Sequence, residues 1–349
     1  MANNRLKVHI LFKFIEGPWG GGNQFLKALR EYFRKVGVYS ESLGDADIIL
    51  FNSHHCFNEL FIVKQKYPNK ILIHRVDGPI SYIRGRDRTI DKAISKFNRL
   101  FADGTIFQSN WCMKQNKERF NINSKYETVI YNAPDSEIFN RNGKTKFNPQ
   151  KVKLIASSWS SNWRKGFEVY QFLDGNLDFS KYELTFIGNS PIAFKNIKHV
   201  KPVPSVKLAP ILKEHDIFIT ASQNDPCSNI LIEALSCGLP AVVLNDGGHP
   251  ELVKEGGELF NSTTDLIAKI EKVAQNHSYF QSRIPGFSIN QVAQDYYDFA
   301  LAIYRDIEKG IYRPRMVNIK TRITFYNLKF MIFLWKESNK LRAVKDRIC

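Results

Sequence analysis

Short runs rich in isoleucine, valine and leucine alternate with helix-like segments along most of this chain, and the alternation restricts the folds it can adopt. In the first part, helical patterns separate strand-like runs at residues 6–14, 47–52, 70–76, 105–108 and 127–131. Apolar runs of this length between helices are typical of a parallel sheet covered on both faces. The sequence therefore predicts an α/β protein.

A polar stretch at 140–150, with Asn, Gly, Lys and Pro and no periodicity, interrupts the alternation as a linker would. Further strand-like runs follow at 153–157, 182–187, 216–220 and 241–244. A chain of 349 residues is longer than one hydrophobic core usually serves. We therefore predict two doubly wound domains around a ligand-binding cleft. The predicted segments are a first domain at 1–140, a linker at 141–150, a second domain at 151–288, a closing helix at 289–309 and a basic tail at 310–349.

The net charge of +16 is concentrated at the carboxyl end. Residues 309–349 contain eleven Lys and Arg against only Glu337 and Asp346, a balance of +9. Such a segment favours an anionic partner, and composition leaves nucleic acid, anionic lipid and a phosphorylated substrate open. A hydrophobic fraction of 43% excludes a chain that is disordered throughout.

Cysteine usage and hydropathy indicate the compartment. The five cysteines are scattered and form no C-x-x-C pair, which predicts reduced thiols and neither a disulfide framework nor a zinc site. We find no run of about 18 apolar residues and no apolar signal region at the start. We therefore expect a cytoplasmic protein.

The segment 221–240 carries the strongest functional signal. Ser228 suits a helix N-cap, and helical spacing continues from Asn229 until the sequence Gly238-Leu239-Pro240. The free N–H groups and the dipole at such a helix start form a site for a diphosphate. Glu233 would lie roughly 6 Å further along the axis, within reach of a ribose diol. Asp225, on the preceding loop, could accept hydrogen bonds from sugar hydroxyls. Either acid alone is more simply a helix-end or surface carboxylate, but the combination favours a binding site.

This segment closely resembles glycosyltransferase family four, the retaining, nucleotide-sugar-dependent enzymes of the GT-B fold. Those enzymes carry an acid-x7-acid pair, then A-x-x-x-G-x-P-V-V, then G-G-x-x-E. Here the first two motifs read Asp225-x7-Glu233 and 234–243, and the third reads Gly247-Gly248-His249-Pro250-Glu251. The resemblance implies two Rossmann-like domains, with Glu233 holding the ribose and Asp225, where the family usually has Glu, holding the donor sugar. The predicted donor contacts around them are Pro226, Cys227, Ser228 and Asn229.

The segment 157–167 resembles the part of the family that supplies an Arg and, five residues later, a Lys before Gly, both clamping the donor diphosphate. Lys165-Gly166 matches. The Arg position falls on Ser160, so the Arg role is either absent or taken by Arg164. We assign Ser160, Arg164 and Lys165 to donor binding, with the alternative that Arg164 and Lys165 only solvate a turn.

The first domain contributes two further predictions. The glycines at 20–22 link a strand to a helix, and the family's equivalent loop faces the donor phosphates, so we assign Gly21 and Gly22 there. His74, near a strand end, occupies the region where family members often line the donor sugar's pocket, although a lone His is often structural. Arg75 and Asp77 are predicted on the acceptor side. The predicted catalytic residues are His74, Asp225 and Lys165.

We expect no metal and no cofactor apart from the nucleotide-diphosphate sugar itself. Asp45-Ala46-Asp47 looks like the metal motif of the other major glycosyltransferase fold, but it precedes a buried strand. The GT-B resemblance implies metal independence, and the histidines and cysteines show no ligand spacing.

The tail contains an apolar stretch at 325–335 that is too short to span a bilayer. Because Arg322, Lys329 and Lys336 lie around it, it suits an amphipathic helix on an anionic membrane surface. The alternative is a helix that packs back across the two domains with its basic face in solvent. Either arrangement makes a lipid-linked or membrane-proximal acceptor plausible.

Together these features predict a retaining, metal-independent glycosyltransferase, cytoplasmic or peripheral on the cytoplasmic membrane face. It would use a nucleotide-sugar donor and a glycan or lipid-linked acceptor. No nucleic-acid recognition module is recognisable, so we expect no nucleic-acid partner. The alternatives are a sugar-nucleotide epimerase or a phosphorylase on the same fold, and a non-catalytic basic protein that binds membrane or nucleic acid.

Overall fold

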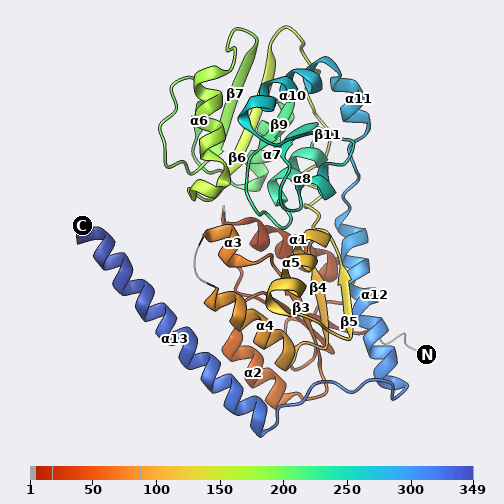
Figure 1. Ribbon diagram of the computed structural model, residues 1–349. Helices are drawn as coiled ribbons and strands as arrows, with labels where there is room; N and C mark the ends of the chain where they lie inside the picture. Colours follow the sequence, from red (N-terminus) through yellow and green to blue (C-terminus); the bar gives the residue numbers. More distant parts are fainter. Residues whose placement is uncertain (1–4, 18, 86–87, 349) are drawn as a thin grey trace.

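Two α/β domains, one above the other in Figure 1, make up the protein. This computed structural model describes residues 5–17, 19–85 and 88–348. The first domain has a parallel five-stranded sheet in the order β1-β2-β3-β4-β5. Its strands are β1 (Val8–Leu11), β2 (Ile48–Asn52), β3 (Ile71–Val76), β4 (Gly104–Phe107) and β5 (Tyr126–Val129). Its helices are α1 (Gly21–Lys35), α2 (Phe57–Lys66), α3 (Ile80–Arg84), α4 (Thr89–Phe101) and α5 (Asn110–Phe120).

The second domain has a parallel six-stranded sheet in the order β11-β10-β9-β6-β7-β8. Its strands are β6 (Val152–Ser158), β7 (Tyr182–Gly188), β8 (Lys198–Val200), β9 (Ile217–Thr220), β10 (Ala241–Leu244) and β11 (Gly257–Phe260). Its helices are η1 (Trp163–Lys165), α6 (Phe167–Asn176), α7 (Ser205–Lys213), α8 (Asn229–Ser236), α9 (His249–Val253), α10 (Thr263–Gln275) and α11 (His277–Ser282). The predicted α/β fold with two parallel sheets is therefore confirmed.

Burial of the central strands explains why their sequences are apolar throughout. Every residue of β2, β3 and β9 is buried, because helices cover both faces of each sheet. Strands in this position cannot alternate between apolar and polar residues as a half-exposed strand would. Polar side chains that serve a ligand are therefore found just beyond the carboxyl ends of the strands.

Helix α12 (Ile289–Glu308) corrects one prediction. We expected it to close the second domain, but it crosses to the first domain and packs on α1. Ala293, Tyr296 and Ala300 lie in the same core as Phe25 and Leu29 of α1. Its apolar face therefore completes the first domain, whose sheet would otherwise lack part of its cover.

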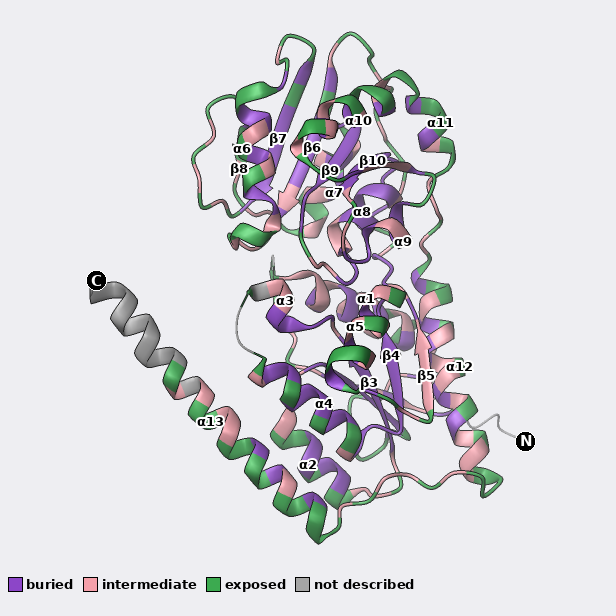
Figure 2. Ribbon diagram, viewed as in Figure 1, coloured by how far each residue is buried: buried purple, intermediate pink, exposed green. Residues whose placement is uncertain are grey.

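Helix α13 (Ile319–Ile348) follows and packs on α4 and α2 of the first domain. Phe325 and Leu328 are buried, and the Phe325 ring stacks on Phe61 at 4.0 Å between centroids. Figure 2 shows buried, intermediate and exposed residues alternating along its first half, and Figure 1 shows the helix leaving the domain surface towards its carboxyl end. Within the described residues, no helix is both long enough and apolar enough to cross a membrane.

Candidate active site

A cleft with a volume of about 390 Å³ lies between the two domains, at the carboxyl ends of both sheets. The first domain lines it with the loop before α1, the residues after β2 and those after β3. The second domain lines it with the segment after β6, the loop after β9 and the start of α8. Of the predicted site residues, those in the cleft wall are Gly21, Gly22, Asp77, Ser160, Lys165, Asp225, Pro226, Cys227, Ser228, Asn229 and Glu233.

Helix α8 begins at Asn229, inside the cleft, after Ser228 in extended conformation. The Ser228 side chain makes no capping hydrogen bond, so the first N–H groups of α8 are not capped by this residue. The start of α1 meets the start of α8 here. A Cβ on Gly21 would lie only 2.5 Å from Asn229 Nδ2, so glycine allows this approach. Two helix N-termini thus converge on one side of the cleft, where their dipoles favour an anion.

Lys165 and Asp225 form an ion pair in the cleft wall. Lys165 Nζ lies 3.0 Å from Asp225 Oδ2 and 3.0 Å from Ser222 Oγ. Burial opposes ionisation of the Asp225 carboxyl, but the charges of Lys165 and His249 and the hydrogen bond from Lys165 outweigh it and lower its pKa. Asp225 is therefore an ionised acceptor beside a fixed cation.

Glu233 lies one turn into α8 with only 8% of its surface exposed. Burial alone raises the pKa of its carboxyl to about 8. Among the residues that the structure describes, no cation forms an ion pair with it. With this pKa the carboxyl is mostly protonated at neutral pH, so it can donate a hydrogen bond as well as accept one, which suits a ligand with hydroxyl groups.

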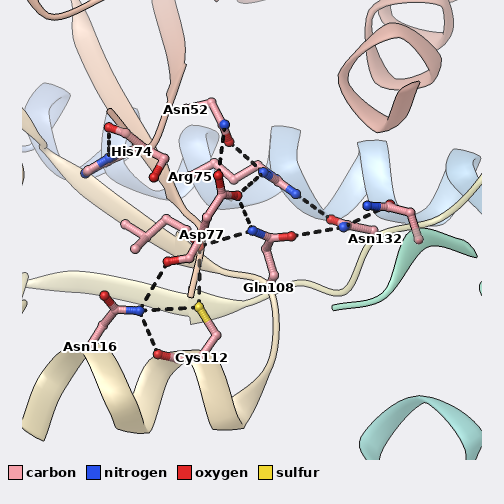
Figure 3. Close-up of polar contacts among 11 residues, drawn as sticks. Asn52, His74, Arg75, Asp77, Gln108, Cys112, Asn116 and Asn132 are labelled. Carbon is pink, nitrogen blue, oxygen red and sulfur yellow. Dashed lines mark hydrogen bonds and ion pairs between the residues drawn. The ribbon is translucent and has the colours of Figure 1, made fainter. Parts of the chain in front are cut away.

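Arg75 does not reach the cleft, contrary to the expectation of an acceptor contact. Its guanidinium is fully buried and donates to Asp77 Oδ1 at 2.9 Å, Asn52 Oδ1 at 2.5 Å and Asn132 Oδ1 at 2.8 Å (Figure 3). Asn132 in turn donates to Asn229 Oδ1 at 3.1 Å. Arg75 therefore holds Asp77, which does line the cleft, and connects the first domain's core to the start of α8.

His74 is also directed away from the cleft. Its ring is fully buried, stacks on Phe51 and lies between Ser53 O at 3.0 Å and Asn98 Nδ2 at 3.1 Å. Burial lowers its pKa to about 4, so the imidazole is neutral at physiological pH. This geometry is that of a structural histidine, and it does not support the predicted catalytic role.

Ser160 and Arg164, both predicted to bind the donor, lie in different places. Ser160 lies in the cleft wall, where its Oγ accepts from Asn162 N at 3.2 Å. Arg164 instead extends to the first domain and donates to Tyr82 O at 3.2 Å. Arg164 thus joins the domains in this structure, so Lys165 is the cation of this segment in the cleft wall.

The structure adds cleft residues that the sequence reasoning missed. Trp19 and Trp159, one from each domain, face each other at 5.8 Å between ring centroids. His54 and His55 line the cleft immediately after β2, and Gln108 does so immediately after β4. The sequence contained a signal for His54, His55 and Gln108, because they follow the buried strands β2 and β4 in the same way as Asp77 follows β3.

Glu251, the last residue of the third motif, connects the domains. Its carboxylate accepts from Asn110 N at 2.8 Å and Trp111 N at 2.7 Å, at the start of α5, and from Tyr131 Oη at 2.8 Å. A carboxylate at a helix N-terminus interacts favourably with the dipole and satisfies free N–H groups. This acid of the second domain therefore caps a helix of the first.

The Asp45-Ala46-Asp47 sequence has a structural place outside the cleft. Asp47 Oδ2 accepts from Lys7 N at 2.7 Å, beside the start of β2. Over the described residues, no three His, Cys, Asp or Glu side chains gather in a way that could hold a metal ion.

Two parallel α/β domains that face each other across such a cleft are the architecture of the GT-B fold. Residues 170–276 match the family model described as "Glycosyl transferases group 1", which contains Asp225, Glu233 and Glu251. The second domain therefore carries a glycosyl transferases group 1 region, and the predicted resemblance and GT-B fold are confirmed.

Particular relatives agree with this class. Over 191 residues the chain is 27% identical to the GPI3 subunit of phosphatidylinositol N-acetylglucosaminyltransferase from Saccharomyces cerevisiae. The match covers 49% of this chain and 42% of that protein, so the chain spans less than half of that relative. Among solved structures, sucrose-phosphate synthase from Thermosynechococcus elongatus aligns with a TM-score of 0.65, and Anabaena HepE in complex with UDP-glucose with 0.62. Each is 14% identical and covers 88% of this chain and 99% of its own, which supports a shared fold.

Proposed function

We propose that the protein transfers a sugar from a nucleotide-diphosphate sugar to a glycan or lipid-linked acceptor, with retention of anomeric configuration. The observation that carries this proposal is the meeting of Lys165, Asp225 and Glu233 with the start of α8 in one interdomain cleft. The match of residues 170–276 to a glycosyltransferase family supports it. HepE, a neighbour of the same fold, holds UDP-glucose.

In this proposal the donor diphosphate lies against the N–H groups at the start of α8 and against Lys165. As the bond between sugar and diphosphate breaks, negative charge grows on the leaving phosphate, and a fixed cation and helix dipole stabilise that charge. No metal ion or further cofactor takes part. Lys165 is already held in place by Asp225 and Ser222, so little reorganisation is needed when the donor binds.

The two acids take different roles. Asp225, ionised and adjacent to Lys165, accepts hydrogen bonds from hydroxyls of the donor sugar. Glu233, further along α8, binds the ribose diol. The apolar side chains of Ile187, Val203 and Leu208, which line the same cleft, suit the flat face of the base.

The acceptor enters from the first domain, where Asp77 and the glycines at the start of α1 line the opposite wall. Retention requires the acceptor hydroxyl to attack from the face that the diphosphate leaves. Closure of two domains over the donor limits access of water, which would otherwise hydrolyse it.

We further propose that the protein acts at the cytoplasmic face of a membrane, as a peripheral protein. The name of the yeast relative describes a transferase acting on phosphatidylinositol, which is a membrane lipid. The basic carboxyl-terminal segment supports the same location, because anionic headgroups attract clustered Lys and Arg.

The test is a titration of the purified protein with UDP, GDP, ADP and their common sugar conjugates, with the midpoint of thermal unfolding as the readout. We expect one nucleotide series to raise the midpoint, because a ligand that binds only the folded state stabilises it. Glu233→Ala should abolish the shift, whereas Glu168→Ala, an exposed acid on α6, should retain it. If no nucleotide shifts the midpoint of the folded wild-type protein, the proposal is wrong. Conversion of the donor without acceptor would favour an epimerase.

A further inference from the structure

In the part of helix α13 whose side chains the structure describes, there are two apolar faces, and one of them packs on the rest of the protein. Thr321, Phe325 and Leu328 are buried against α2 and α4, with Met331 and Ile332 partly buried beside them. This inner face accounts for the attachment of the helix to the first domain. It does not account for the remaining large apolar side chains of the same helix.

The second face is an outer stripe of six large apolar side chains. These are Ile319, Ile323, Tyr326, Phe330, Phe333 and Leu334, each between 51% and 77% exposed. At about 100° per residue they fall within one sector of the helix, roughly opposite Phe325 and Leu328. Isolated exposed apolar residues are ordinary, but a continuous stripe on one helix indicates an interaction surface.

The charges around the outer stripe identify its partner. Lys320, Arg322 and Lys329 are exposed between the inner and outer faces, and residues 309–336 contain no Asp or Glu. A second copy of the chain on this stripe would bring two positively charged helices together. An anionic lipid surface instead pairs its headgroups with the Lys and Arg side chains and accepts the apolar side chains beneath them.

We propose that the outer stripe of α13 docks on an anionic lipid surface, with the helix lying in the plane of the interface. This deepens the membrane location given above, and it adds which residues enter the lipid. Transfer of an exposed aromatic side chain out of water is worth roughly tenfold in affinity, so Phe330 and Phe333 dominate the apolar part. Lys320, Arg322 and Lys329 supply the preference for anionic headgroups.

The docked helix would also orient the enzyme, because it is fixed to the first domain. Just before α13, Tyr312 Oη donates to Asp103 Oδ1 at 2.9 Å and Arg315 N donates to the same oxygen at 2.8 Å. Asp103 is itself buried and paired with Lys64. The lipid surface therefore holds the first domain, which lines the acceptor side of the cleft.

The test is sedimentation of the full chain with vesicles, without nucleotide. The vesicles are phosphatidylcholine alone or equal parts phosphatidylcholine and phosphatidylglycerol. We expect binding to the mixed vesicles, and roughly tenfold or greater weakening in Phe330→Ser/Phe333→Ser. Tyr279→Ser removes an exposed aromatic of the second domain and should bind as the wild type does. Lys320→Glu/Lys329→Glu should lose the preference for the anionic vesicles.

Three results would overturn the inference: no binding of wild type to anionic vesicles, unchanged binding of Phe330→Ser/Phe333→Ser, or a wild-type dimer that this variant converts to monomer while vesicle binding is unchanged. The altered side chains are exposed, so the variants should unfold at the wild-type thermal midpoint. A measured midpoint at that value shows that a variant is folded. Nucleotide titration of the wild-type protein separates the two proposals, because absence of donor binding would contradict only the transfer activity, whereas the vesicle assay contains no nucleotide.

Discussion

Lys165 Nζ lies 3.0 Å from Asp225 Oδ2, and this ion pair joins η1 to the loop before α8. The two side chains are 23% and 14% exposed, so each is partly shielded but still open to the cleft. A diphosphate that entered the cleft would share Lys165 with Asp225. In the proposed function, the pair places the cation for the phosphate next to the acceptor for the sugar hydroxyls.

The first prediction separates these two roles. Asp225→Asn keeps the shape but removes the charge, so it should weaken binding of the nucleotide sugar and turnover by at least roughly tenfold, while the nucleoside diphosphate alone binds nearly as before. Lys165→Met should weaken both ligands, because both contain the diphosphate. Calorimetric titration of each variant with the two ligands measures the difference. Equal losses for both ligands in Asp225→Asn would contradict the assignment.

The second prediction concerns the pH dependence of stability through Glu233. Burial raises the pKa of this carboxyl from 4.5 to about 8 in the folded protein. Between those pH values the folded state holds more protons than the unfolded state, so the free energy of unfolding falls as pH rises. Glu233→Gln carries no charge and removes this decline. We expect the variant to unfold several degrees higher than wild type at pH 8, with the difference shrinking towards pH 5.

Thermal unfolding of wild type and Glu233→Gln across this pH range measures the effect. Parallel curves of midpoint against pH would show that Glu233 keeps an ordinary pKa. The same variant should weaken nucleotide binding, since an amide presents one acceptor oxygen to the ribose hydroxyls where a carboxylate presents two. A gain in stability with a loss of binding is typical of a residue kept for function.

The third prediction compares two adjacent glycines. A Cβ on Gly21 would meet Asn229 Nδ2 at 2.5 Å, whereas a Cβ on Gly22 has no neighbour within 4 Å. Gly21→Ala should therefore separate the starts of α1 and α8 and reduce nucleotide binding roughly tenfold or more. Gly22→Ala should leave binding near the wild-type value and stabilise α1 slightly. If the two variants bind nucleotide equally, the close approach has no functional role.

The fourth prediction concerns the contact between Glu251 and the first domain. Glu251→Ala removes the acceptor for two N–H groups of α5 and for the Tyr131 hydroxyl, and should lower the free energy of unfolding by about 1–3 kcal/mol. Combined with Tyr131→Phe in a double-mutant cycle, the loss should be less than additive. Urea unfolding measures all the variants. Glu255→Ala, an exposed acid 3.6 Å from Arg283, is the matched control and should change little.

Much of the fold could be predicted because local pattern and tertiary environment agree in most elements. Buried parallel strands require apolar runs, and α8 combines a polar start with a Gly-Leu-Pro end. The segment 257–275 was not predicted, although its helix α10 begins with a capping box formed by Ser262 and Asp265. The placement of α12 on the first domain could not be predicted, because an apolar helical face does not indicate which of two domains it will cover.

In the candidate site, too, the positions of some residues could be predicted from the sequence and those of others could not. Lys165, Asp225 and Glu233 lie on loops or a helix start that open into the cleft, as their motif indicated. His74 and Arg75 were placed there because they lie near a strand end, but both are still within β3, whose residues are all buried. Asp77 is beyond the strand and does reach the cleft. A difference of two residues along a strand thus separates a structural side chain from one open to a ligand.

The chain crosses between the domains twice, once at 140–150 and again just before α12. With α12 and α13 both packed on the first domain, a molecule resting on a surface through α13 would keep that half stationary. Any interdomain motion would then be a motion of the second domain, which carries Lys165, Asp225 and Glu233. A ligand bound from solution by that domain would be brought to a first domain that stays fixed at the surface.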